Sequence, residues 1–230
     1  MLWYKNWLET RSRVVFNLIM WTGFITFLFY FVVKHDPIDS KFDYEMMSFL
    51  AAFSLSTFVS LAGSGVRTQA GHLRMMPDTR STVYTLSLPV GRCRLLLMRS
   101  ALGLLEAAAL TVVYAILVWI LYLFEKTTRD FTGPLVLIVF CGVWIYSVAS
   151  LLSTFLNEAI YIWIIWLLVF LYFIFAVGGW MPAFLNVFAA MRQPTGTGSS
   201  PWLQAASFLV LAGIFLFASI KVVESQEYAQ

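Results

Sequence analysis

Long apolar runs separated by short polar segments dominate the chain. A transmembrane α-helix needs about 20 consecutive, mostly apolar residues to cross the hydrocarbon core of a bilayer. Stretches of this kind cover residues 14–33, 46–65, 101–124, 134–155, 159–177 and 202–223. The pattern therefore predicts an all-α fold: a polytopic membrane protein with six transmembrane helices, which form a single transmembrane domain over residues 1–230.

The composition supports this interpretation and excludes other classes of protein. Of the 230 residues, 60% are hydrophobic and 12% are charged, whereas an ordinary soluble domain is about 45–50% apolar and about 25% charged. In water, such a chain would expose larger apolar patches than a soluble monomer tolerates. These values exclude a disordered chain, a disulfide-stapled secreted module and a sizeable soluble catalytic domain. The first run exceeds the roughly 7–15 apolar residues of a cleavable signal peptide, so we expect a retained helix.

The distribution of basic residues predicts the orientation of the spans. If the N-terminus is cytoplasmic, most lysines and arginines fall in the cytoplasmic segments, as the positive-inside rule requires. The cytoplasmic set is Lys5, Arg11, Arg13, Arg67, Arg74, Arg80, Arg92, Arg94, Arg99 and Lys221, and the outer set is Lys34, Lys41, Lys126, Arg129 and Arg192. We therefore expect a multi-pass protein of the cytoplasmic (inner) cell membrane with both termini in the cytoplasm. Tyr122 and Trp202, near span ends, suit anchoring at the membrane interface.

Residues 2–13 predict an amphipathic helix ahead of the first span. At 100° per residue, Trp3, Trp7 and Leu8 share one helical face, while Lys5 and Glu9 lie opposite. A helix of this kind lies in the headgroup plane with its tryptophans toward the lipid. Two roles remain open for it: a simple membrane anchor, or a lever joined to the first span.

The longest polar connection, residues 66–99, is basic and has its own helical signals. Asp78 or Ser81 is a suitable N-cap for a short helix over about residues 79–88. Pro89 disfavours helical structure at the residue before it and ends that helix. A new helix is expected to begin near Gly91 and to run into the third span. The short helix would carry a mixture of apolar and polar side chains, namely Arg80, Thr82, Val83, Leu86 and Leu88.

One stretch of this loop carries a family resemblance. Leu86-Ser87-Leu88-Pro89-Val90-Gly91-Arg92, followed by Leu95 and Arg99, resembles the "LxLPVSR…L…K/R" segment of ABC-2 type permeases, the membrane subunits of ATP-binding-cassette transporters. Gly91 stands where that family usually has serine. The order of elements is also similar along nearly the whole chain, with the motif after the second of six spans and a tight cytoplasmic turn between spans four and five.

The resemblance implies a permease subunit, with export as the expected direction of transport. The loop 66–99 would then contain a cytoplasmic coupling helix, between helices 2 and 3, that docks onto a separate nucleotide-binding ATPase subunit. Residues 178–201, apolar but too short to cross and broken by glycine and proline, would form a partly re-entrant extracellular hairpin before helix 6. The docking residues implied are Asp78, Arg80, Thr82, Val83, Leu86, Leu88, Pro89, Arg92 and Arg94.

The same resemblance implies the partners and cofactors. The chain contains no Gly-x-x-x-x-Gly-Lys-Ser/Thr phosphate loop, so it has no ATPase site of the P-loop kind. It would be a non-enzymatic subunit that binds no cofactor itself, with ATP and Mg on the partner ATPase. One six-helix subunit would pair with a second permease copy or a homologous permease, and no nucleic acid is expected as a partner.

Polar residues inside the predicted spans are the remaining candidate sites. Glu106 lies well inside the third span, seven residues after Arg99 and near the same helical face. A charge at this depth costs about 2.5–3.5 kcal/mol at the membrane centre, and less near the interface. Pairing with a nearby basic group and a role in the transport pathway both remain open for Glu106. Two stripes of small hydroxyl residues, suited to close helix packing or to lining a pathway, are Thr57, Ser60 and Ser64 and then Ser147, Ser150 and Thr154.

Other kinds of chemistry find little support in the sequence. Cys93 and Cys141 lie in a basic loop and an apolar span, and they lack the spacing of metal ligands. His35 and His72 fall on opposite sides of the membrane in the predicted topology, so no metal site or catalytic triad is expected. The alternative to a permease is a membrane protein that is not driven by ATP, channel-like or an assembly factor, whose basic loop serves only the orientation.

Overall fold

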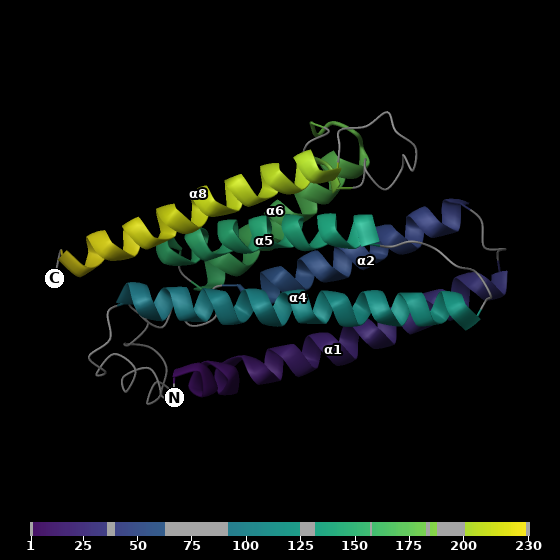
Figure 1. The fold of residues 1–230 in the computed structure, drawn as a ribbon, viewed down its shortest axis with the longest axis horizontal. Helices are drawn as coiled ribbons and strands as arrows, with labels where there is room; N and C mark the ends of the chain where they lie inside the picture. The colour runs from purple at the N-terminus through teal and green to yellow at the C-terminus, as the bar shows by residue number, and fades with distance from the viewer. Residues whose placement is uncertain are drawn as a thin grey trace.

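The computed structural model describes residues 2–35, 40–62, 92–124, 132–156, 158–182, 185–187 and 201–228. These ranges contain no strand, and their helices are α1 (Leu2–His35), α2 (Ser40–Leu61), α4 (Arg92–Phe124), α5 (Thr132–Phe155), α6 (Glu158–Val177) and α8 (Pro201–Tyr228) (Figure 1). For the described part of the chain, the prediction of an all-α fold is confirmed.

Four of these helices are long and apolar enough to cross a membrane. Their apolar segments are Thr10–Phe31, Leu96–Leu123, Thr132–Phe155 and Trp202–Ser225. The molecule is therefore a membrane-embedded helical protein. The described parts of α2 and α6 contain shorter apolar stretches, Met46–Leu61 and Trp163–Ala176, and the number of six spans stays a prediction.

The helices form an elongated bundle in which successive helices run in opposite directions. Figure 1 shows α1 along one edge and α8 along the other, with α4, α2 and α5 between them. Both chain termini lie at the same end of this bundle, together with the C-terminal end of α2 and the N-terminal end of α4. The two helix ends that flank residues 63–91 therefore lie at the same end of the molecule as the termini.

Helix α1 joins the N-terminal segment to the first span without a break. Its 34 residues reach about 51 Å, well beyond the roughly 30 Å hydrocarbon core of a bilayer. No glycine or proline interrupts residues 2–13, so the helical hydrogen bonds continue into the span. The structure thus differs from the expected separate helix over residues 2–13, and the position of this segment at the membrane surface stays a prediction.

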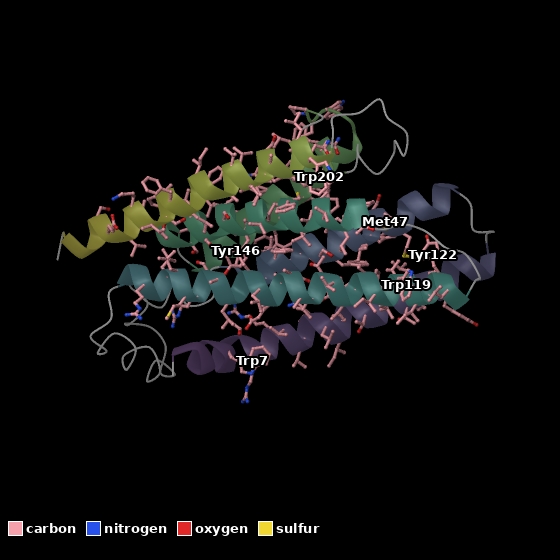
Figure 2. The ribbon with its side chains drawn as sticks, viewed as in Figure 1. Trp7, Met47, Trp119, Tyr122, Tyr146 and Trp202 are labelled. Carbon is pink, nitrogen blue, oxygen red and sulfur yellow. The ribbon has the colours of Figure 1, made fainter. Side chains whose placement is uncertain are left out.

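The aromatic residues at the span ends have different surroundings. Trp202 is 75% exposed at the start of α8, and Figure 2 shows it at the edge of the bundle opposite to Trp7. An exposed tryptophan near the end of a span suits interfacial anchoring. Tyr122, by contrast, is completely buried. Its ring packs edge-on against Phe29 of α1, with 5.8 Å between the ring centroids. The expectation of Tyr122 as an interfacial anchor is therefore wrong, because its ring fills the contact between α1 and α4.

Close packing holds α5 against its neighbours at two glycines. A Cβ atom on Gly142 would overlap the ring of Phe58 of α2, which is completely buried. A Cβ atom on Gly103 of α4 would overlap the hydroxyl of Tyr146, which Figure 2 shows between α5 and α4. Small residues at such contacts let membrane helices approach closely. Both glycines therefore set the spacing of α5 against α2 and α4.

The C-terminal end of α6 is closed by a Schellman turn. Trp180 N donates to Phe175 O at 3.0 Å, and Gly179 N donates to Ala176 O at 3.3 Å. This pair of bonds requires a left-handed residue at Gly179, whose φ is 75°. After the turn the chain comes back toward α6, because the Asn186 side-chain amide donates to Ala176 O at 2.8 Å. The described part of 178–201 thus folds back on α6, and its depth in the membrane stays a prediction.

Candidate functional site

A set of side-chain hydrogen bonds joins α1, α2 and α4 across their interfaces. We call this set the polar seam, and it consists of three pairs, Thr10 with Glu106, Asn17 with Ser60, and Thr57 with Tyr114.

Glu106 of α4 is bonded to the N-terminal part of α1. The Thr10 hydroxyl donates to Glu106 Oε1 at 2.8 Å, and the two residues are only 7% and 6% exposed. The hydrogen-bond partner of Glu106 is thus a hydroxyl group on another helix. The seven-residue spacing between Arg99 and Glu106 in the sequence does not indicate this partner. The second oxygen, Oε2, is buried and has no hydrogen-bond partner among the described residues. Half of the acceptor capacity of this carboxyl group is therefore unmet in an apolar setting, which is costly for a buried polar group.

Asn17, seven residues after Thr10 and thus about two helical turns further along α1, connects α1 to α2. Its Nδ2 donates to Ser60 Oγ at 2.8 Å and to the Arg13 carbonyl, also at 2.8 Å. Its Oδ1 accepts from Trp21 Nε1 at 3.0 Å. Asn17 is 5% exposed, so all of its polar atoms are satisfied inside the bundle. An amide that is bonded on every side holds one orientation and fixes α1 against α2.

The third pair, Thr57 with Tyr114, joins α2 to α4. The Thr57 hydroxyl donates its one proton to Phe53 O at 2.9 Å. The 3.4 Å contact between Thr57 Oγ1 and the Tyr114 hydroxyl therefore has Tyr114 as its donor. Both side chains are completely buried. The polar seam thus connects α1 to α4, α1 to α2 and α2 to α4 by side-chain hydrogen bonds.

The stripe on α5 behaves differently from the residues of the polar seam. Ser147 donates to Val143 O at 2.7 Å, and Thr154 donates to Leu151 O at 2.7 Å. Ser150 is buried, and its hydroxyl has no partner among the described residues. These bonds stay within α5, and all three side chains are buried in the bundle. They support the packing interpretation of this stripe.

The remaining candidate residues are described only in part. Ser64 and the docking residues from Asp78 to Pro89 lie outside the described residues. Arg92 and Arg94 lie in the first turn of α4, where Arg94 is exposed. Helix α4 begins at Arg92, close to the start near Gly91 that the sequence predicts, and it carries basic residues at that end.

A second group of polar contacts, missed by the sequence analysis, lies around Tyr172 of α6. Its hydroxyl donates to Leu185 O at 3.1 Å and accepts from Val187 N at 3.5 Å. Because the phenolic proton is used by Leu185, the 3.3 Å contact with Cys141 has the thiol as its donor. Tyr172 therefore joins α5, α6 and the returning segment 185–187.

Both groups of contacts are hydrogen bonds that connect helices and the returning segment to one another. Among the described residues, no group of three His, Cys, Asp or Glu side chains lies close enough to hold a metal ion. Sequence analysis identified Glu106, Thr57 and Ser60 but missed their partners. The one available signal was Asn17, an amide within an apolar run. No protein-family model, curated protein or solved structure matches the chain.

Proposed function

We propose that this chain is the permease subunit of an ABC-2 type ABC transporter, and that it works as an exporter in the inner cell membrane. In this proposal α2 and α6 also span the membrane, and both termini are cytoplasmic. A separate ATPase subunit binds ATP and Mg and docks on the loop 66–99. A second permease copy, or a homologous permease, completes the pathway.

The observation that carries the proposal is the hydrogen bond between Thr10 and Glu106. Helix α4 starts at Arg92, directly after the stretch that resembles the docking segment of ABC-2 permeases. Glu106 lies 14 residues further along α4, about 21 Å at 1.5 Å per residue, and is bonded to Thr10 of α1. A displacement of the loop is therefore transmitted along α4 to the helix that begins the chain.

The polar seam supports a lever mechanism. Binding of the ATPase and of ATP shifts the loop and with it the N-terminal end of α4. Asn17 of α1 is bonded to Ser60 of α2, and Tyr114 of α4 is bonded to Thr57 of α2. The three helices α1, α2 and α4 therefore move together as one unit. This unit meets α5 at Gly103 and Gly142, where side chains and backbone approach closely. The motion thus becomes a shift of one group of helices against the other.

The positions of the helix ends support the proposed docking surface. The termini and the ends of α2 and α4 that flank the loop lie at one end of the bundle (Figure 1). Arg11 and Arg13 in the N-terminal half of α1 and Arg94 in the first turn of α4 are exposed. Basic residues at this end agree with a cytoplasmic location.

Reconstitution tests this function against the alternative of a membrane protein that is not driven by ATP. The chain and an ATPase encoded next to it are placed together in lipid vesicles, and ATP hydrolysis is measured with and without the chain. Our proposal predicts that the chain changes the rate of hydrolysis and that vesicles with the chain alone show no ion leak. A chain that conducts ions alone and leaves hydrolysis unchanged would support the channel-like alternative instead.

A further inference from the structure

A cavity of about 340 Å³ lies between α5 and α6. Its walls come from α5 residues such as Trp144 and Val148, from α6 residues such as Val169 and Tyr172, and from Met181 in the segment after α6. Carbon atoms of these side chains form nearly all of its surface. A volume of this size falls within the range of pockets that bind small molecules, about 300–1,000 Å³.

The cavity opens on the lipid side of the bundle. Leu168, Leu171 and Phe175 line it and are 41%, 36% and 41% exposed. Ile165 and Val169 line it too, but they are only 2% and 6% exposed. The cavity thus continues from the lipid-facing surface of α6 into the interior, toward side chains that the bulk bilayer does not reach.

We propose that this cavity binds one acyl chain of a bilayer phospholipid. Water is a poor occupant, because apolar cavities of this kind stay dry. A hydrocarbon chain is thin, apolar and abundant at the opening, and it restores the dispersion contacts that an empty cavity lacks.

The acyl chain would also position the contact between α5 and α6. Tyr172 lines the cavity and at the same time contacts Cys141 and Leu185 through its hydroxyl. Trp144 lines it too, and its ring packs against Tyr172 with 5.9 Å between centroids. A bound chain therefore supports the two rings that hold α6 and the returning segment in place. This role needs only a membrane-embedded protein and does not depend on the proposed transport function.

Photolabelling of the full-length protein tests the proposal. The protein is reconstituted in phosphatidylcholine vesicles that contain a small fraction of phosphatidylcholine with a diazirine in one acyl chain, illuminated, and mapped by mass spectrometry. We expect label on Ile165 and Val169, which the bulk lipid does not reach. Leu137 and Ala212, equally buried but away from the cavity, should stay unlabelled. Label confined to exposed residues would overturn the proposal, whether the cavity were empty or filled by protein.

A matched pair of variants strengthens the test. Val148→Trp fills the cavity from α5, and Val210→Trp adds the same bulk to α8 at a position that is 64% exposed. Val148→Trp should abolish the label on Val169, and Val210→Trp should leave it in place. Label on Val169 that survives Val148→Trp would contradict a site in this cavity. If Val148→Trp does not fold, the labelling pattern of the unmodified protein still decides the question.

Discussion

The hydroxyl of Thr10 and the carboxyl group of Glu106 are 2.8 Å apart although 96 residues separate them in the sequence. This bond fixes the N-terminal part of α1 to the middle of the long helix α4. Both residues are almost fully buried, so the bond is shielded from competing water. It is one of the contacts that hold α1 to α4, the helix that follows the basic loop.

Removal of the Thr10 hydroxyl should destabilise the bundle. Thr10→Val keeps the shape of the side chain but removes the donor to Oε1 of Glu106. Since a buried group that loses its partner costs about 1–3 kcal/mol, we expect the free energy of unfolding to fall by about 1–2 kcal/mol. Thr10→Ser keeps the donor and should remain close to the unmodified protein. Unfolding in mixed micelles measures this difference, and equal stability of the valine and serine variants would contradict the bond.

Neutralisation of Glu106 should leave docking of the ATPase intact but change the coupling between the chain and ATP hydrolysis. Glu106→Gln keeps an oxygen that accepts from Thr10, but it removes the charge from the polar seam. We expect the ATPase to copurify as before, while ATP hydrolysis by the reconstituted complex changes several-fold. Unchanged hydrolysis would assign Glu106 a purely structural role.

The glycine at the contact of α5 with α2 should not tolerate a methyl group. Gly142→Ala would force the buried ring of Phe58 to move, and overpacking of this kind costs about 1–3 kcal/mol. Gly213→Ala is the matched control, because nothing lies within 4 Å of a Cβ atom at Gly213. The control should be neutral or slightly stabilising. If both alanine variants unfold at the same temperature, that result would contradict the close approach of α5 to α2 at Gly142.

The hydroxyl of Tyr172 should hold the segment that follows α6. Tyr172→Phe keeps the ring between α5 and α6 but removes the bonds to Leu185 and Val187. We expect faster amide hydrogen exchange at Val187 and unchanged exchange in α4, because the loss is local. Protection of Val187 that matches the unmodified protein would show that other contacts hold this segment.

The sequence predicts the helices well because their signal is local. Apolar runs of sufficient length define α1, α4, α5 and α8, and the structure places helices over all of them. The start of α4 at Arg92 also agrees with the sequence, which predicts a new helix near Gly91 because Pro89 disfavours helical structure just before it. The continuous helix α1 was missed, because an amphipathic segment and an apolar segment can share one axis when no residue breaks the helix.

The contacts between helices could not be predicted, because the local signal of a helix leaves its rotation against its neighbours open. Glu106 is visible in the sequence as a charge in a span, but its partner Thr10 lies on a helix whose facing side is set by packing. Tyr122 is the same kind of case, since its position near a span end suits an anchor while its ring is buried against Phe29. Polar residues can thus be found by their cost in a membrane, while their partners follow from the fold.

Copurification from native membranes tests the central claim, that a separate ATPase docks on this chain, most directly. The tagged chain and a variant that lacks residues 79–88 are purified in parallel, and the ratio of ATPase to chain is measured. Thr10→Ser, which should behave like the unmodified protein, is purified in the same way as a control variant. Our account predicts that an ATPase copurifies with the complete chain and is lost from the deletion variant. An equal amount of ATPase with both proteins, or none with either, would contradict it.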